Sequence, residues 1–362
     1  MRVLMISIDR GLLGKNQLGD VIERHARYGR SVEKLDILIF TMKGSKSYQI
    51  SKNVTAYPTN SNSKLLYGFD AKKAAEKLFI KNKYDLIITQ DPFITGFVGM
   101  QLKAKFGAKL LVHFHGDFWE NKSWLKESKL NPLFLVISKI VVSRADGVRV
   151  MSEGQKDKLF KAGVTEEKIR VISTPVDLVK YQIDLNKSQN TKTVLHVSRY
   201  DEVKDFKTLA EAWKIVASEL PEVNFVQVGA GDKLKNIFGG LKVKMFPRTS
   251  QHEIVDFYHQ SAVVVLSSRS ESFGKVLVEA NACGKPVVAT ATTGAKEIIQ
   301  DGYNGYLVPV GDANQLAEKI IYLLNNPEVA KTMGKNGKKL VSEKFGDNTS
   351  KIINFWKEII NG

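Results

Sequence analysis

Short apolar runs alternate with helix-like segments along the whole chain, and this alternation limits the possible folds more than any other feature. Runs rich in valine, isoleucine and leucine have the length of buried strands at residues 2–8, 36–40, 85–89, 109–115, 147–151, 193–198, 224–229, 262–268 and 286–290. Strands that are apolar throughout are covered on both faces, as in parallel sheets. Helix-like segments lie between them, for example at 70–82, 207–220 and 313–326. The pattern predicts a doubly wound α/β architecture.

The strand–helix series starts again at residue 193, after a polar segment that contains Pro175. A chain of 362 residues is long for one domain and sufficient for two. We therefore expect two Rossmann-like domains that face each other across a cleft, residues 1–180 and 181–345. The last segment, 346–362, is predicted to be a helix and is a candidate to cross back to the first domain.

Positive charge is concentrated in the first half of the chain. Residues 1–185 carry 31 Lys and Arg against 19 Asp and Glu, a net +12, whereas residues 186–362 carry 23 against 19, a net +4. Such an asymmetry marks the half that meets an anionic partner. Nucleic acid, an acidic lipid surface and a phosphorylated substrate all fit this observation, and general solubility is the alternative.

Several classes of protein are disfavoured by what the sequence lacks. No apolar run approaches the roughly 18 residues of a membrane span. The single cysteine, Cys283, excludes an internal disulfide and suits a reducing compartment, so a cytoplasmic location is predicted. Neither an Asp-x-Asp pair nor a Cys/His cluster with metal-ligand spacing occurs, so no metal or other cofactor is expected.

The stretch SRSESFGKVLVEANACGKPVV, residues 268–288, joins a strand to a loop and a helix. The helix is predicted to begin near Gly274 and to end at Gly284. Ligands of such sheets bind beyond the carboxyl ends of the strands. The backbone N–H groups of Phe273, Gly274 and Lys275 are therefore expected to form an anion site at the helix N-terminus.

Two glutamates, Glu271 and Glu279, flank this helix start. Glu279 lies roughly 6–7 Å along the helix axis, which is about the distance from a bound diphosphate to its ribose. We expect Glu279 to accept hydrogen bonds from ribose hydroxyls, and Glu271 to face the group at the other end of the diphosphate. The alternative is that both are solvated surface carboxylates.

Residues 267–312 resemble the signature of glycosyltransferase family 4. The signature has E-x7-E, then A-C-G-x-P-V-V-A, a glycine-containing turn and D-G-x-N-G-x-L-V, and this chain has each element in that order. The resemblance extends more weakly over the whole chain. It implies a GT-B fold, retention of anomeric configuration, and no need for a bound metal.

Further site residues follow from the same resemblance. The segment HVSRYDEVKDFKTLAEAW is similar to the one whose cations grip the donor diphosphate, which implies that role for Arg199 and Lys204. The family often has glycine where this chain has Asp205. Arg248 is similarly expected to contact the base, although Pro247 stands where the family usually has a glycine. The alternative for Arg199 and Lys204 is a solvated loop.

In the first domain, HFHGDFW resembles the strand end that bears an active-site histidine. The matching residue, His115, is expected to contact the transferred sugar rather than to abstract a proton. His113 is expected to be a core histidine. Gly19 resembles a glycine of the first-strand loop that approaches the donor phosphate, although Leu18 stands where the family commonly has another glycine.

The first domain binds the acceptor in this family. The segment WENKSWLKESK, residues 119–129, mixes aromatic with basic side chains, which suits a membrane interface: Trp119, Trp124, Lys122, Lys126 and Lys129. We therefore expect a glycan or lipid-linked acceptor and an anionic membrane surface as partners, with the protein peripheral on the inner membrane face. The alternative is that both tryptophans pack into the core.

The leading hypothesis is a retaining glycosyltransferase that uses a UDP- or GDP-sugar in cell-surface polysaccharide or glycolipid synthesis. A GT-B-fold sugar-nucleotide epimerase is the enzymatic alternative. The non-enzymatic alternative is a basic nucleic-acid-binding protein, which would need basic and aromatic residues interleaved on a known binding module. No such module is found in the sequence, so nucleic acid is not expected as a partner.

Overall fold

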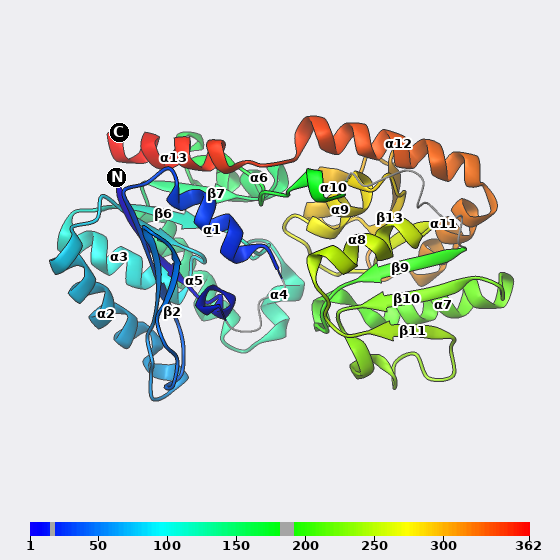
Figure 1. Ribbon diagram of the computed structural model, residues 1–362, viewed down its shortest axis with the longest axis horizontal. Coiled ribbons are helices and arrows are strands. Elements are labelled where there is room, and N and C mark those ends of the chain that lie inside the picture. The colour runs from blue at the N-terminus through cyan, green and yellow to red at the C-terminus, as the bar shows by residue number, and fades with distance from the viewer. Residues whose placement is uncertain (15–18, 182–191) are drawn as a thin grey trace. The chain divides into compact units, whose positions relative to one another are not determined.

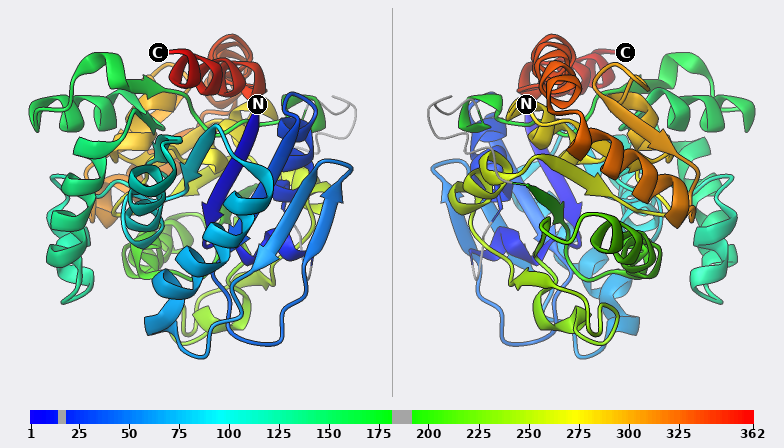
Figure 2. Two further views of the ribbon diagram at one scale, coloured as in Figure 1. Left: turned by 90° about the vertical axis from the view of Figure 1, so that its left-hand side faces the viewer. Right: turned by 90° about the vertical axis from the view of Figure 1, so that its right-hand side faces the viewer.

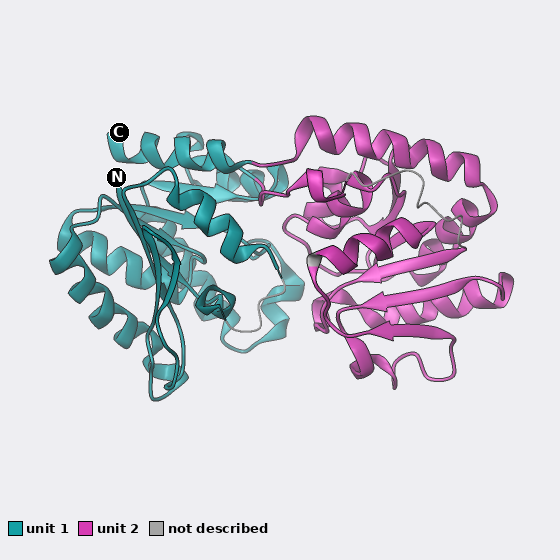
Figure 3. Ribbon diagram, in the orientation of Figure 1, with its two compact units in different colours: residues 1–172, 348–362 teal, residues 173–347 magenta. Residues whose placement is uncertain are grey.

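In the computed structural model, which describes residues 1–14, 19–181 and 192–362, the chain forms two compact units (Figure 1). Unit 1 comprises residues 1–172 and 348–362, and unit 2 comprises residues 173–347 (Figure 3). The unit boundaries thus lie at 172/173 and 347/348, beside the expected boundaries at 180/181 and 345/346. Both units are sheets with helices on their faces, so the doubly wound α/β prediction is confirmed.

Unit 1 is built on an eight-stranded sheet of order β3-β4-β2-β1-β5-β6-β7-β8. All its neighbouring strands pair in parallel except β3 and β4, which form an antiparallel hairpin. The strands are β1 (Arg2–Ser7), β2 (Lys34–Ile39), β3 (Tyr48–Ser51), β4 (Val54–Pro58), β5 (Leu86–Thr89), β6 (Lys109–His113), β7 (Gly147–Val150) and β8 (Ile169–Val171). The apolar runs of the sequence did not predict β3, β4 and β8, because these strands are short and partly polar.

Helices cover both faces of this sheet, and the alternation of side chains along β1 shows how. Leu4 and Ile6 pack with α2, α3 and α5, whereas Val3 and Met5 pack with α1 and α13. The last helix, α13, therefore covers one face of the sheet of unit 1, and the two ends of the chain lie near each other (Figure 2). The helices are α1 (Val21–Gly29), α2 (Tyr67–Asn82), α3 (Ile94–Phe106), α4 (Lys122–Glu127), α5 (Asn131–Arg144), α6 (Glu153–Lys161) and α13 (Thr349–Asn361).

Unit 2 has a six-stranded sheet of order β11-β10-β9-β12-β13-β14, with every recorded pairing parallel. Its strands are β9 (Thr193–Val197), β10 (Asn224–Val228), β11 (Val243–Phe246), β12 (Val263–Leu266), β13 (Val287–Thr290) and β14 (Gly305–Val308). Its helices are α7 (Phe206–Glu219), α8 (Gln251–Gln260), α9 (Lys275–Ala282), α10 (Thr293–Ile298), α11 (Ala313–Asn325) and α12 (Pro327–Lys344). The strand order reverses between β9 and β12, where a doubly wound sheet opens a crevice for a ligand.

Candidate active site

The loops that follow β9 and β12 are tied together at the point where the strand order of unit 2 reverses. The hydroxyl of Ser267 donates to the carbonyl of Lys204 at 2.7 Å, and the amide of Arg269 donates to the carbonyl of Val203 at 2.7 Å. Because β9 and β12 are parallel neighbours, their carboxyl ends meet at one edge of the sheet. The site predicted from residues 268–288 therefore lies next to the segment that carries the predicted cations.

Glu271 and Lys204 form an ion pair across these two loops. The Lys204 ammonium lies 2.5 Å from the Glu271 carboxylate, and the Ser268 hydroxyl donates to the same oxygen at 2.7 Å. Both side chains are largely covered. The surface-carboxylate alternative is therefore wrong for Glu271. An anionic ligand that binds Lys204 would compete with Glu271 for its charge.

The helix of the predicted anion site, α9, begins directly after Gly274. Gly274 is the N-cap residue, with a φ of 84° in the left-handed region that glycine adopts without steric cost. Among the described residues, no acceptor takes a hydrogen bond from the amides of Phe273 or Gly274. The Phe273 ring is buried against Phe345, so the loop presents the Phe273 backbone rather than its ring.

A second helix start, that of α10, packs against the same loop. The amide of Gly294 donates to the carbonyl of Glu271 at 2.8 Å. A β-carbon added at Gly294 would lie 2.4 Å from the amide nitrogen of Phe273, closer than real contacts allow. The glycine-containing turn of the sequence signature, which includes Gly294, thus packs closely against the backbone of the Glu271 loop and holds that loop in place.

Glu279 is buried and accepts two hydrogen bonds from tyrosines. The hydroxyl of Tyr181 donates to Oε1 and that of Tyr258 to Oε2, each at 2.8 Å. The ammonium of Lys275 lies 3.5 Å from Oε1. Burial, and then the neighbouring Glu279 charge, raise the pKa of Tyr258 well above its ordinary value, which keeps it a donor. Glu279 is therefore a positioned acceptor rather than a solvated carboxylate.

Sequence reasoning did not find the two tyrosines. Tyr181 comes from the short 3-10 turn Leu178–Tyr181, and Tyr258 comes from α8. Tyr181 lies 98 residues from Glu279 along the chain, and Tyr258 lies 21 residues from it. No local pattern could have indicated their contact with Glu279, because only the folding of unit 2 brings these three segments together.

The remaining predicted cations of unit 2 are exposed. Arg199 follows β9 with 80% of its side chain accessible, and its guanidinium lies 3.2 Å from Asp201. It therefore has a different partner from Lys204, although both lie in the loops after β9. Arg248 lies in the loop after β11 and is exposed.

The backbone conformation at position 205 is one that favours glycine, and aspartate can replace glycine there. Asp205 has a φ of 47°, in the left-handed region where glycine is favoured and aspartate is tolerated. Its carboxylate accepts from the Thr208 hydroxyl at 2.8 Å and pairs with Arg269 at 3.0 Å. Burial alone would raise the pKa of Asp205, but Arg269 and Thr208 outweigh it and hold the pKa below its ordinary value. Asp205 therefore keeps the turn and caps α7.

In unit 1, the predicted histidine lies at the carboxyl edge of the sheet. The Nε2 atom of His115 is 2.6 Å from the side-chain oxygen of Gln90, which follows β5. His113 is buried within β6, and burial, followed by the charge of Arg149, holds its pKa well below the ordinary value. It is thus the core histidine that was expected. Gly19 is exposed just before α1, whereas Leu18 lies outside the described residues.

The structure corrects the expectation that Trp119 lies on a membrane-facing surface. Trp119 is buried, and its indole nitrogen donates to the hydroxyl of Ser138 at 2.8 Å. Trp124 stacks on Phe93 with ring centroids 5.4 Å apart. The aromatic half of the predicted interface therefore belongs to the packing of unit 1, because these rings have apolar partners there. The neighbouring lysines Lys122, Lys126 and Lys129 remain exposed.

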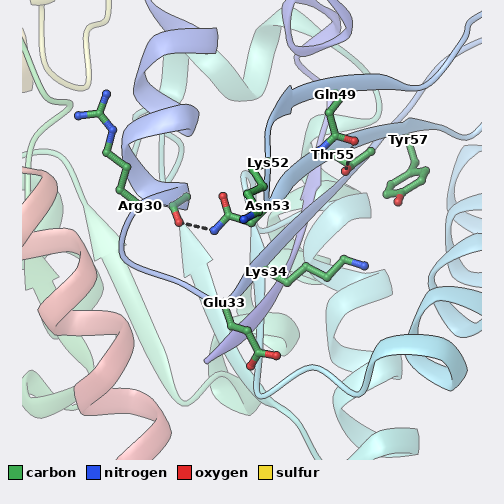
Figure 4. A pocket seen from close by; sticks show the side chains of 9 residues that line it. Arg30, Glu33, Lys34, Gln49, Lys52, Asn53, Thr55 and Tyr57 are labelled. Atoms are coloured by element: carbon green, nitrogen blue, oxygen red, sulfur yellow. Dashed lines mark hydrogen bonds between the residues drawn. The ribbon is translucent and has the colours of Figure 1, made fainter.

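A separate basic pocket of about 740 Å³ lies at the end of α1 and beside β2–β4 (Figure 4). The Asn53 side chain closes one wall by donating to the carbonyl of Gly29 at 2.6 Å. Lys34 is the first residue of β2, whereas Thr55 and Tyr57 lie in β4, so the pocket runs along this part of the sheet. None of the predicted site residues lines it; its walls are Gly29, Arg30, Glu33, Lys34, Gln49, Lys52, Asn53, Thr55 and Tyr57.

The described residues contain neither a metal-binding cluster nor a membrane-spanning helix. In residues 1–14, 19–181 and 192–362, no group of three His, Cys, Asp or Glu side chains is arranged to hold a metal ion. No helix in the same part of the chain is both long and apolar enough to cross a membrane.

Comparisons with known proteins agree with the two-unit architecture. The model of the family described as Glycosyltransferase Family 4 matches residues 21–180, and the model described as Glycosyl transferases group 1 matches residues 180–340. An uncharacterised glycosyltransferase of Methanocaldococcus jannaschii is 30% identical over 285 residues, which cover 77% of this chain and 76% of that protein. A capsular polysaccharide biosynthesis glycosyltransferase of Staphylococcus aureus is 29% identical over 243 residues, which cover 62% of this chain and 63% of that protein.

Solved structures with the same fold cover the entire chain. The sucrose-phosphate synthase of Thermosynechococcus elongatus matches with a TM-score of 0.83 at 23% identity, covering 100% of this chain and 99% of that one. HepE of Anabaena, solved in complex with UDP and glucose, matches with a TM-score of 0.77 at 21% identity and covers 100% of both chains. With two family models that together span residues 21–340 and a relative that is 30% identical, the chain belongs to the group 1 and family 4 glycosyltransferases and has the GT-B fold.

Proposed function

We propose that this glycosyltransferase moves a sugar from a UDP- or GDP-sugar to an acceptor hydroxyl, with retention of anomeric configuration, in the synthesis of a cell-surface polysaccharide or glycolipid. The observation that carries the proposal is the meeting of the loops after β9 and β12, which brings Lys204, Glu271 and the start of α9 to one edge of unit 2. The relatives support the product class, since one is a capsular polysaccharide biosynthesis glycosyltransferase and another a poly(ribitol-phosphate) α-N-acetylglucosaminyltransferase.

The donor's charged part would be held by backbone and cations together. The amides at the start of α9, from Phe273 to Lys275, can donate to a phosphate at the positive end of the helix dipole. Lys204 and Arg199 would neutralise the charge that grows on the departing diphosphate. These cations support a reaction that needs no bound metal, and transfer should therefore continue in excess EDTA.

The nucleoside would be read by Glu279 and Arg248. Tyr181 and Tyr258 hold the Glu279 carboxylate in place, and each of its oxygens can still accept a further hydrogen bond from a ribose hydroxyl. Arg248 is exposed after β11 and is assigned to the base. The structure of HepE in complex with UDP and glucose makes UDP the first nucleotide to test.

Glu271 is assigned to the sugar. Its negative charge would stabilise the positive charge that develops on the sugar ring as the bond to the diphosphate breaks. The ion pair with Lys204 sets the direction of the carboxylate and links the sugar end of the donor to its diphosphate end. From unit 1, His115 is assigned to contact with the transferred sugar, and Gly19 to the approach of the donor phosphate.

A donor screen tests this proposal. Ligands that bind only the folded protein stabilise it, by about 2.7 kcal/mol at a ligand concentration 100 times Kd. We expect one or more UDP- or GDP-sugars to raise the melting temperature, and donor consumption to require an added glycan or lipid-linked acceptor. A product of inverted anomeric configuration would refute retention. Rapid consumption of donor without acceptor would instead identify an epimerase or a hydrolase.

A further inference from the structure

We propose that unit 1 docks on an anionic lipid bilayer through the outward face of α5 and the lysines around it. This α5 surface consists of four apolar and four basic residues: Leu130, Leu133, Val136, Ile140, Lys122, Lys126, Lys129 and Lys139. The proposal deepens the proposed function by naming the surface that would meet a lipid-linked acceptor. It rests on that function only for the nature of the acceptor.

The apolar residues of the α5 surface are unusually accessible. Leu130, Leu133 and Val136 are 56%, 56% and 55% exposed, and Ile140 is 48% exposed. Their spacing of three and four residues places them on one stripe of the helix.

The opposite stripe of α5 is also apolar, and it forms part of the core of unit 1. Val141 and Val142 pack there with residues of α2, α3 and the sheet. A surface helix of a water-soluble domain normally has a polar outward face. The outward face of α5 is therefore suited to a medium other than water.

Charge favours a lipid surface as that medium. Residues 120–144 contain five basic residues and two acidic ones, a net +3, and the helix α5 itself contains no acidic residue. Lysine stems can lie along apolar surface while the ammonium groups reach anionic headgroups. Lysine is depleted in protein–protein interfaces, and a second copy of this chain would bring like charges together. The combination fits an anionic bilayer better than a protein.

Two neighbouring helices extend the apolar character at the same edge of the sheet. Leu65, in the short turn before α2, is 95% exposed; Phe69, in the first turn of α2, is 67% exposed; and Phe97, near the start of α3, is 39% exposed. Because α2, α3 and α5 each follow a parallel strand or precede the next one, they begin at the carboxyl edge of the sheet. His115 and Gln90 lie at that edge. A bilayer bound there would present lipid headgroups to the edge that bears His115.

Vesicle co-sedimentation of the full chain tests the proposal. The assay would compare binding to vesicles of phosphatidylcholine alone with binding to vesicles of phosphatidylcholine and phosphatidylglycerol, at low and at high salt. One variant combines Leu133→Ser, Val136→Ser and Ile140→Ser; a second combines Lys126→Gln, Lys129→Gln and Lys139→Gln. The matched control lies at the other end of α2, where Ile80 is 77% exposed beside two lysines: Ile80→Ser, Lys81→Gln and Lys83→Gln.

The wild type should bind anionic vesicles at low salt and neutral ones far less. Each lysine near such a surface contributes about fivefold in binding, so the lysine variant should lose on the order of a hundredfold. High salt should weaken the wild type in the same direction. The apolar variant should lose tenfold or more, and the control variant should remain within about twofold of the wild type.

The proposal would be overturned if the wild type bound neutral and anionic vesicles equally well, if the α5 variants bound anionic vesicles as tightly as the wild type, or if the control variant lost as much binding as the α5 variants. Concentration-dependent dimerisation abolished by the apolar variant would also overturn it, in favour of a second copy of the chain. Nucleotide-induced thermal stabilisation, measured on the same variants, should be unchanged because the α5 surface lies outside the donor site. A wild type that binds vesicles but no nucleotide sugar would refute the proposed function and leave the docking surface standing.

Discussion

At the scale of single residues, the candidate site consists of carboxylates that are already held by neighbours. Glu271 is paired with Lys204, and Glu279 is fixed by Tyr181 and Tyr258. Neither glutamate is a free surface group. A substitution at either position therefore changes an existing network as well as a contact with the ligand, so variants that keep the shape of the side chain, such as Glu271→Gln and Tyr258→Phe, are the informative ones.

The first prediction concerns the Lys204–Glu271 pair. Lys204→Met should cost on the order of 2–4 kcal/mol of transition-state stabilisation, and Glu271→Gln should lower kcat more than it raises KM for the donor. The double variant should lose less than the sum, because the two residues are in contact. Lys192→Met, at an exposed position that has no assigned role, is the control and should cost little. Strictly additive losses in kcat/KM would show that the two residues serve separate sites.

The second prediction separates the ribose role of Glu279 from its structural role. Tyr258→Phe leaves one buried oxygen of Glu279 without its donor, which should lower the free energy of unfolding by about 1–3 kcal/mol. It should also raise KM for the donor while kcat stays near that of the wild type. Tyr303→Phe, on the surface, should change neither quantity. A Tyr258→Phe protein with wild-type KM would argue against ribose binding by Glu279.

At the scale of elements, turns and helix starts bring the loops of unit 2 to their positions. Asp205 occupies a left-handed turn and caps α7, and Gly294 lets α10 approach the backbone of Phe273. Asp205 directly follows Lys204, and Phe273 lies two residues after Glu271. The geometry of the site therefore depends on backbone contacts of residues that would not themselves touch the ligand.

The third prediction is a pH dependence of stability. The pKa of Asp205 is lowered in the folded protein, so its stabilising contribution is complete above its ordinary value of about 4 and is lost as the pH falls through the folded value. Asp205→Asn should thus lower stability at pH 7, and its deficit should shrink as the pH falls below about 4. Urea midpoints at several pH values measure this. Asp232→Asn, on the surface, should show no such deficit; a pH-independent deficit for Asp205→Asn would contradict the charge-based account.

The fourth prediction tests the close approach of α10. Gly294→Ala places a methyl group against the Phe273 backbone, so the loop must move or unit 2 must lose stability. We expect a loss of about 1–3 kcal/mol in unfolding free energy and weaker donor binding. Gly239→Ala is the matched control, because the nearest atom to the added methyl is 3.7 Å away. A Gly294→Ala protein with unchanged thermal midpoint and donor affinity would show that the contact is not needed.

At the scale of the whole molecule, the last helix completes a core that begins with the first strand. Trp356 of α13 is fully buried and meets Tyr28 edge to face, with centroids 5.5 Å apart. It packs with Val3 and Met5 of β1 in unit 1. The end of the chain is therefore part of the fold of unit 1, although unit 2 lies between the two segments in sequence.

The fifth prediction follows from this packing. Trp356→Ala should destabilise unit 1 by about 3–5 kcal/mol, as large core truncations do. Scanning calorimetry should show a lowered transition for unit 1, while Trp213→Ala, in the core of unit 2, should lower the other transition. Lys357→Ala, exposed on the same helix as Trp356, is the control and should have little effect. If the Trp356→Ala protein melted at the same temperature as the wild type, α13 would not contribute to the core of unit 1.

The sequence by itself determined the fold class, the main strands and the place of the α9 site, because these depend on local periodicity, helix termini and a contiguous signature. Only the tertiary structure decided which side chains meet. The Lys204–Glu271 pair joins loops 67 residues apart, and Tyr181 reaches Glu279 across 98 residues. It also decided that Trp119 is core while Leu133 and Val136 face outward. Burial is a property of how elements pack, and an apolar residue type does not specify whether its partner is the core or a surface outside the chain.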